Sequence, residues 1–192
     1  MANDSRARMV RSAAALISSR GMTATSFSEV LLDSGTPRGS IYHHFPYGKQ
    51  QLAEDAIRWT SERVLARQRA CPATTPPQVL AWFIDMWRQV VQTSSGSTGC
   101  VVAGVAIDTG TGEEALITLV RETFRSWITL LTAQLETAGL PTDRAAALAT
   151  TALAGMEGAL ILCRAEGTSA PLEAVAAQLT RLVPAEPAAA GS

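Results

Sequence analysis

The sequence predicts an all-helical protein, and three observations support this fold class. Aromatic residues make up only 5% of the 192 residues while Ala and Leu dominate, a balance that favours helices over sheets. Apolar residues recur at helical spacing along most of the chain, without strand-like alternation. Hydrophobic residues reach 47%, enough for one large domain or two small domains that share a core.

Charge divides the chain into two halves of opposite sign. Residues 1–70 contain ten Lys/Arg and six Asp/Glu, a balance of +4, whereas residues 71–192 contain six and eleven, a balance of -5. The total of -1 argues against a simple polybasic nucleic-acid binder. The asymmetry instead indicates a nucleic-acid-facing half joined to a half with another role, and the boundary lies near the Pro-rich segment 71–77.

The cysteines and the N-terminus predict a cytoplasmic protein. Cys71, Cys100 and Cys163 are odd in number and far apart, which indicates free thiols in a reducing compartment. The N-terminus lacks the apolar core of a signal peptide, and no uninterrupted apolar run approaches the roughly 18 residues of a membrane span. We therefore expect no membrane partner, and the sequence indicates no cofactor and no metal.

Local signals define the first two helices. Apolar residues share one face over residues 4–19, and Gly21 then ends the helix. Ser26 and Glu29 have the spacing of a capping box, which predicts a short second helix that ends at residues 34–35, Ser-Gly.

A third helix is expected immediately after this turn. Thr36 can cap it and Pro37 suits its first turn, while Ile41 and Phe45 would point to the core. Two short helices joined by a tight, Gly-containing turn are what a DNA-reading unit requires. A fourth helix is expected over residues 49–69.

The second half predicts five further segments. A helix with a heavy apolar face begins after Thr75, and a polar loop at 93–99 follows it. The later helices are expected at 100–107, 113–137, 142–167 and 169–183, with Thr142 or Asp143 capping the third of these and Ser169 the last. The Pro/Ala-rich tail 184–192 is expected to be disordered.

Two motifs give the N-terminal region a family resemblance. Residues 18–27, SSRGMTATSF, and 34–46, SGTPRGSIYHHFP, closely resemble the signature of TetR-family repressors, which covers roughly the first sixty residues. Residues 45–52, FPYGKQQL, and 99–102, GCVV, resemble the LmrA/YxaF-like subgroup, whose members regulate drug or small-molecule response genes.

The resemblance implies an N-terminal three-helix helix-turn-helix domain and a C-terminal helical domain for ligand binding and dimerisation. The expected ranges are 1–48 for DNA binding, 49–70 for a connecting helix, and 71–183 for the C-terminal domain. The implied function is a repressor, released from its operator by a small, largely apolar molecule. Its partners would be double-stranded DNA, a second copy of the chain and that effector.

The resemblance also assigns the side chains that face DNA. They are Thr36, Pro37, Arg38, Ser40, Tyr42, His43 and Lys49. Tyr42, His43 and Lys49 match positions that contact the DNA backbone, whereas the fork of Arg38 suits guanine O6 and N7. Pro37 departs from the family, where Ser is common, and its ring nitrogen cannot donate to a phosphate.

Some polar and charged side chains of the N-terminal region have alternative interpretations. Tyr42 could be an ordinary packing residue, and Arg6, Arg8 and Arg11 could either hold phosphate or form a solvated face. His43 and His44 are adjacent, so on a helix they point about 100° apart and are poorly placed to share a metal.

Small residues on the eighth predicted helix form a candidate dimer interface. They are Ala145, Ala149, Ala152, Gly155 and Ala159. The resemblance implies that two such helices from each subunit form a four-helix bundle. Packing within one chain is the alternative.

Large apolar residues of the C-terminal half are candidates for lining a ligand cavity, although such residues are usually core. They are Trp82, Phe83, Met86, Trp87, Phe124, Trp127, Ile128 and Met156. Glu157 lies among apolar residues, where an unpaired carboxylate is costly. It would bind a ligand donor or pair with an arginine such as Arg88 or Arg164.

Two other classes of function are alternatives to this one. The sequence has no G-x-S-x-G, H-E-x-x-H, Walker or dinucleotide motif, and its two histidines both lie in the predicted DNA-reading helix, so an enzyme is not expected. A ligand-independent DNA-binding or partner-binding module would differ only in having a filled C-terminal core.

Overall fold

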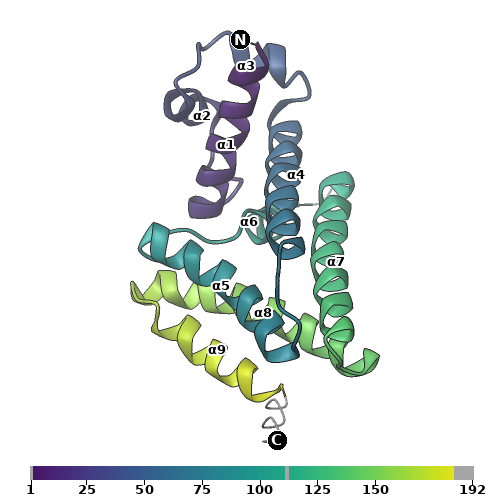
Figure 1. The fold of residues 1–192 in the computed structure, drawn as a ribbon. Coiled ribbons are helices and arrows are strands. Elements are labelled where there is room, and N and C mark those ends of the chain that lie inside the picture. Colours follow the sequence, from purple (N-terminus) through teal and green to yellow (C-terminus); the bar gives the residue numbers. More distant parts are fainter. Residues whose placement is uncertain (1, 111–112, 184–192) are drawn as a thin grey trace, which may run out of the picture. The chain divides into compact units, whose positions relative to one another are not determined.

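The structure is a computed structural model that describes residues 2–110 and 113–183, and it confirms the all-helical fold class (Figure 1). Within this part of the chain there is no strand. The helices are α1 (Ala2–Arg20), α2 (Phe27–Ser34), α3 (Ser40–His44), α4 (Gly48–Arg69), α5 (Pro76–Ser94), α6 (Val101–Asp108), α7 (Glu114–Thr137), α8 (Thr142–Glu166) and α9 (Ala170–Arg181).

The helices form two compact units that each combine distant stretches of the chain. The first unit joins the residues up to 64 with 98–125, and the second joins 65–97 with the residues from 126 onward. Each unit is therefore discontinuous in the chain, whereas the C-terminal domain expected from sequence is one continuous range, 71–183. The reason is that α6 packs on α1 and so belongs to the first unit.

Helix α1 is the centre of the first unit, because both α2 and α6 pack against it (Figure 1). Met9, Ala13 and Ile17 follow one another at helical spacing and are buried, as their periodicity predicted. The C-terminal turn of α1 approaches the chain around α6 closely. Gly99 donates its backbone N–H to the carbonyl oxygen of Ser18 at 2.8 Å.

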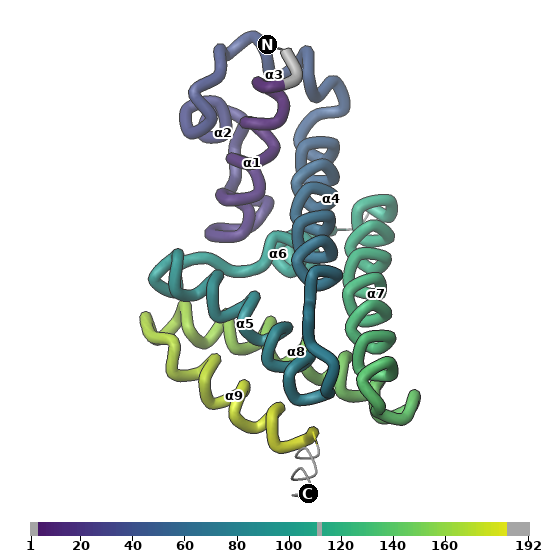
Figure 2. The backbone as a smooth tube through the Cα atoms, in the orientation of Figure 1, coloured from purple at the N-terminus to yellow at the C-terminus, as the bar shows by residue number. Residues whose placement is uncertain are grey.

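In the second unit, α8 packs against both α5 and α9 (Figure 2). By length and composition alone α8 could cross a membrane, but many of its apolar residues form the core of this unit. Ala145, Leu148, Ala152 and Met156 are among those buried. A core helix of a soluble protein meets the same length and composition criteria.

Several predicted helix boundaries differ from the structure by one to a few residues. Helix α3 begins at Ser40 and not at Pro37, because residues 38 and 39 form a turn in which the Ser40 N–H donates to the carbonyl oxygen of Pro37. Helix α5 continues through Ser94 into the expected loop. Helix α8 already includes Thr142, and the N-cap position is Pro141. The expected disordered tail at 184–192 lies outside the described residues.

The turn after α2 depends on Gly35, which gives the first testable prediction. Gly35 has a φ of 61°, and a Cβ there would lie no nearer than 3.9 Å to Arg8. We expect Gly35→Ala to lower the free energy of unfolding by about 1 kcal/mol through backbone strain alone. Chemical denaturation would measure this. Gly35→Asn should lose less, because Asn tolerates the left-handed region, and equal losses would contradict the backbone explanation.

Candidate nucleic-acid interface

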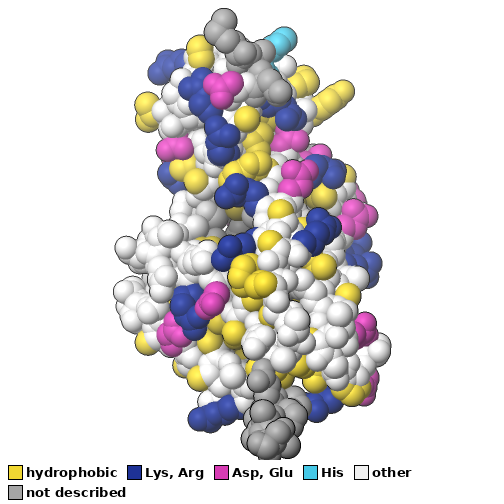
Figure 3. Space-filling view, in the orientation of Figure 1, with side chains coloured by type: hydrophobic (Ala, Val, Ile, Leu, Met, Phe, Trp, Pro, Cys, Tyr) yellow, Lys and Arg dark blue, Asp and Glu magenta, His cyan; other side chains and the backbone are white. Residues whose placement is uncertain are grey.

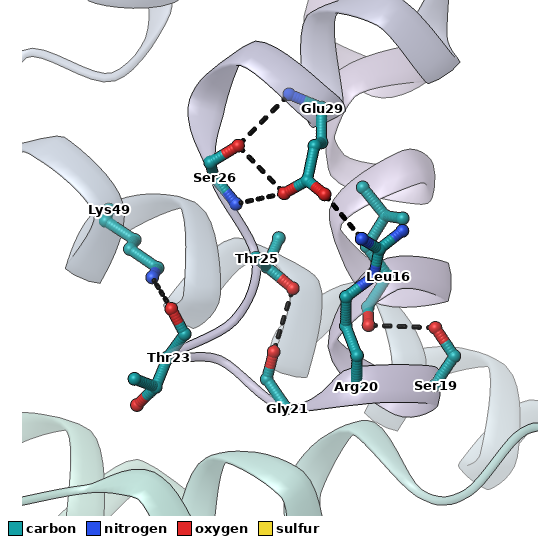
Figure 4. A network of polar contacts seen from close by, with 9 residues as sticks. All are labelled: Leu16, Ser19, Arg20, Gly21, Thr23, Thr25, Ser26, Glu29 and Lys49. Atoms are coloured by element: carbon teal, nitrogen blue, oxygen red, sulfur yellow. Dashed lines mark hydrogen bonds and ion pairs between the residues drawn. The ribbon is translucent and has the colours of Figure 1, made fainter.

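The first helix of the helix-turn-helix is fixed at its N-terminus by the predicted capping box. The Ser26 hydroxyl accepts from the Glu29 N–H, and the Glu29 carboxylate accepts from the Ser26 N–H at 2.9 Å (Figure 4). The Ser26 N–H and the Ser26 hydroxyl both donate to the Glu29 carboxylate, and these bonds are the main reason that the pKa of Glu29 lies below its ordinary value; nearby Arg20 lowers it further. The sequence signal therefore identified this helix start correctly.

The turn between α2 and α3 uses hydroxyl groups that the sequence analysis assigned to DNA. The Ser34 and Thr36 hydroxyl oxygens lie 2.6 Å apart, and both side chains are buried. Thr36 is therefore a structural residue of the turn, which corrects its expected exposure to DNA and its expected role as a helix cap. The Ser40 hydroxyl donates to the carbonyl oxygen of Pro37 at 2.6 Å, so it is partly occupied within the chain.

Helix α3 has one buried and one exposed side. Ile41 and Phe45 are 1% and 0% exposed, which confirms that they point to the core. Tyr42 is 70% exposed and His43 is also exposed. The Tyr42 ring meets the edge of Phe27 at a centroid distance of 5.8 Å, so it both packs and remains accessible. Buried apolar side chains thus hold the short helix on the core, while Tyr42 and His43 are exposed to solvent.

One cationic side chain precedes α3 in the chain and another follows it. Arg38 and Pro37 are exposed in the turn that precedes α3. Lys49 lies in the first turn of α4, and its ammonium group donates to the carbonyl oxygen of Thr23 at 3.0 Å (Figure 4). This contact was not foreseen from sequence, since nothing in the local pattern connects residues 23 and 49. On the face drawn in Figure 3, histidine side chains appear only at the end of the first unit that carries α3.

Two of the three N-terminal arginines have structural partners. Arg6 pairs with Asp55 of α4 and lies 5.5 Å from the centre of the Phe45 ring. Burial raises the pKa of Asp55 in spite of this neighbouring charge. Arg8 pairs with Asp4 and donates to the carbonyl oxygen of Ser34 at 3.3 Å. Arg11 is exposed, so it is the member of this group that remains available to solvent.

The small residues proposed from sequence as a dimer interface lie inside the second unit. Ala145, Ala149, Ala152 and Ala159 are at most 1% exposed. A Cβ at Gly155 would come within 3.0 Å of Val175 on α9. These residues therefore allow close approach within one chain, and the expectation that they form the interface was wrong.

Three aromatic members of the predicted ligand-binding set lie next to one another. Phe83, Trp87 and Trp127 form a run of edge-to-face rings, with centroid distances of 6.0 and 6.4 Å. Trp82 instead stacks on Arg67 and donates its indole N–H to the carbonyl oxygen of Arg67 at 3.1 Å. Phe124 belongs to the first unit and not to the second.

The remaining members of that set differ in burial. Met156 is fully buried, whereas Met86, Ile128 and Glu157 are half-buried. Arg88, one of the expected partners of Glu157, donates to Glu173 and also pairs with Asp85. These two acidic partners raise the pKa of Arg88 further above its already high value.

The pockets described in the second unit have other linings. A pocket of about 340 Å³ is lined by Cys71, Ala73, Thr74, Val79, Ala133, Gln134, Thr137 and Ala138. A smaller one of about 190 Å³ is lined by Leu140, Arg144, Ala147, Leu148, Thr151 and Leu182. All three cysteines are free thiols, as expected. Within the described ranges, no three His, Cys, Asp or Glu side chains are grouped to hold a metal ion.

Comparison with known proteins connects this geometry to a family. Residues 10–56 match the family described as bacterial regulatory proteins, tetR family, and residues 76–178 match the family described as transcriptional regulator LmrA/YxaF-like, C-terminal domain. An HTH-type transcriptional regulator of Mycobacterium tuberculosis is 37% identical over 186 residues, which cover 94% of this chain and 95% of that protein. The HTH-type transcriptional regulator LmrA of Bacillus subtilis is 28% identical and covers 88% and 91% of the two chains.

Solved structures agree with the same fold. A TetR-family regulator from Agrobacterium tumefaciens superposes with a TM-score of 0.84 at 24% identity, covering 96% of this chain and 100% of that one. A TetR regulator from Chloroflexus aurantiacus gives a TM-score of 0.76 at 27% identity, covering 94% of each chain. The family consists of transcriptional regulators and not of enzymes. The chain therefore belongs to the TetR family of DNA-binding transcriptional regulators, and its C-terminal domain is of the LmrA/YxaF-like type.

Proposed function

We propose that the protein is a cytoplasmic repressor that binds operator DNA as a homodimer and is released by a small, largely apolar molecule. The observation that supports this most directly is the construction of α3. Buried Ile41 and Phe45 anchor the helix, while Arg38, Tyr42 and His43 are exposed on the other side. A short helix with exposed polar side chains can enter the major groove.

In this proposal the DNA contacts are divided between bases and phosphates. Arg38 reads guanine through its planar guanidinium fork. Tyr42, His43 and Lys49 contact phosphates, and Pro37 contributes only apolar contact. A dimer with its two recognition helices about 34–36 Å apart would match successive major grooves. Phosphate contacts make the affinity fall as salt concentration rises.

Two alanine variants test this division. Arg38→Ala should lose about 10-fold or more in discrimination between operator and scrambled DNA, because one base contact is removed. Lys49→Ala should weaken binding to both duplexes by a similar factor. The slope of log affinity against log salt concentration should also become shallower by about the contribution of one phosphate contact. Fluorescence anisotropy, with labelled DNA from upstream of the protein's own gene at two salt concentrations, measures both effects.

Arg69→Ala is a control for general loss of positive charge, since Arg69 is exposed at the far end of α4. It should leave discrimination unchanged. Equal losses on cognate and scrambled DNA for Arg38→Ala would contradict the assigned roles. Weak, equal binding of both duplexes by the unmodified protein would count against the repressor function as a whole.

The exposed side of α8 is our candidate for the dimer interface, in place of the buried one. It is uncharged over several turns, and Ile161 and Leu162 are 60% and 49% exposed. The residues that share this exposed side are Ala147, Thr151, Ala154, Gly158, Ile161, Leu162 and Ala165. Small side chains together with exposed apolar ones suit close packing against the same helix of a second copy.

Introducing a charge on this side should therefore separate the subunits. Ala154→Glu places like charges at a symmetric interface, and we expect the dissociation constant of the dimer to rise at least about 10-fold. Analytical ultracentrifugation over a dilution series measures this. Ala81→Glu, on the exposed side of α5, serves as the matched control. An unchanged dimer in Ala154→Glu would exclude this interface.

Trp87 is our candidate for a hydrogen bond to the effector. Its side chain is 6% exposed within the aromatic run, and its indole nitrogen has no hydrogen-bond partner among the described residues. A buried donor without an acceptor costs about 1–3 kcal/mol, so an effector that supplies an acceptor gains this energy. An effector shifts the DNA-binding state only by its difference in affinity for the two states.

Trp87→Phe keeps the aromatic packing and removes the donor. We expect it to bind DNA within about twofold of the unmodified protein, and to need at least about 10-fold more effector for release, since about 1.4 kcal/mol equals a factor of ten. Compounds that release labelled DNA provide the assay. Trp82→Phe is the control, because the Trp82 N–H already has an acceptor. An unchanged response in Trp87→Phe, or equal losses in both variants, would contradict this role.

A further inference from the structure

The backbone of one residue in the first unit, Thr23, contacts two charged side chains. The N–H of Thr23 donates to a carboxylate oxygen of Asp108 at 2.8 Å, and the carbonyl oxygen of the same residue accepts from Lys49 at 3.0 Å. Figure 4 shows the second of these contacts in the loop between α1 and α2. Asp108 is the last residue of α6, 85 positions away from Thr23 in the sequence.

Glycines make this approach possible. A Cβ at Gly21 would lie 2.6 Å from Asp108, and one at Gly104 would lie 3.1 Å from the carbonyl oxygen of Ile17. A Cβ at Gly99 would lie 3.2 Å from the carbonyl oxygen of Ser18. Because these contacts are to the backbone or to a carboxylate held against it, α6 is held in one position on the C-terminal turn of α1. The Asp108 carboxylate is thereby aimed at the loop.

We propose that Asp108 is a positioning residue for DNA binding, which acts on Lys49 by holding the backbone of Thr23. This inference rests on the proposed phosphate contact of Lys49. The charge-assisted hydrogen bond from the Thr23 N–H to the Asp108 carboxylate holds this stretch of backbone in place, and with it the Thr23 carbonyl oxygen that accepts from Lys49. The lysine ammonium has three donors, so one can remain on Thr23 while the others reach a phosphate. Holding the long side chain in advance reduces the entropy lost when DNA binds.

A positioning role and a purely electrostatic role of Asp108 predict opposite changes in DNA affinity when the carboxylate is removed. Removal of a carboxylate near DNA should strengthen binding if only its charge matters, because its repulsion of phosphates disappears. Removal of a positioning residue should weaken binding in spite of that gain. The sign of the effect therefore separates the two explanations.

The test uses the full-length chain and the labelled upstream and scrambled duplexes, with three variants at position 108 and a control. Asp108→Ala removes the acceptor and the charge, whereas Asp108→Asn removes the charge but keeps an oxygen acceptor. Glu114→Ala is the matched control, since Glu114 is exposed in the first turn of α7 and belongs to the same unit. The third variant combines Asp108→Ala with Lys49→Ala. Circular dichroism melting confirms that each variant is folded.

We expect Asp108→Ala to weaken binding to both duplexes about 3- to 10-fold, and Asp108→Asn to stay within about twofold of the unmodified protein. Glu114→Ala should bind equally well or slightly better. The double variant should be no weaker than Lys49→Ala within about twofold, because both changes remove one coupled contribution. In hydrogen exchange measured by NMR, the Thr23 amide should exchange at least about 10-fold faster in Asp108→Ala than in the unmodified protein.

Several outcomes would overturn the inference. Tighter DNA binding by Asp108→Ala would mean that only its charge matters, or that the Thr23 contact withholds Lys49 from phosphate. Fully additive losses in the double variant would mean that Asp108 does not act through Lys49. If Lys49→Ala leaves binding unchanged, the proposed phosphate contact fails and this inference fails with it. If exchange at Thr23 is unaffected, the inference fails while the phosphate contact of Lys49 stands.

Discussion

The packing of α1 against two neighbours at once is the constraint on which the DNA-binding unit depends. Helix α2 covers one part of it, and α6 meets its C-terminal turn through backbone contacts at Gly99 and Gly104. Contacts this close leave no room for compensating side-chain movement. Because α2 leads directly into the turn and α3, the direction in which Arg38 and Tyr42 are presented depends on where α1 is held.

In the second unit, close helix packing involves only one side of α8. Small residues on one side of α8, such as Ala149 and Ala152, are fully buried and let α5 and α9 approach closely. The opposite side is uncharged and exposed, with Ile161 and Leu162 at its C-terminal end. One helix thus supplies the core of its own chain and leaves an apolar surface, which is the property that a symmetric interface requires.

Errors of the sequence interpretation occurred where two local arrangements compete. Thr36 could cap a helix at Pro37 or bond to a neighbouring hydroxyl, and its pairing with Ser34 accompanies a turn that delays α3 to Ser40. The small residues of α8 gave a correct sign of close helix packing, but periodicity does not distinguish a partner within the chain from one outside it. The ion pair of Arg6 could not be foreseen because its partner, Asp55, lies on another helix, and the same holds for the bond from Arg8 to the carbonyl oxygen of Ser34.

The sequence by itself determined the helical class, most helix ends and the family, because these depend on patterns within a few residues. The Ser26–Glu29 capping box and the left-handed Gly35 are examples in which a short motif specifies one backbone geometry. Only the tertiary structure decided which face of α8 is covered, which arginines are paired, and that Asp108 meets Thr23. The physical reason is that the register between distant helices is set by the packing of side chains and close backbone approach, and no local periodicity encodes it.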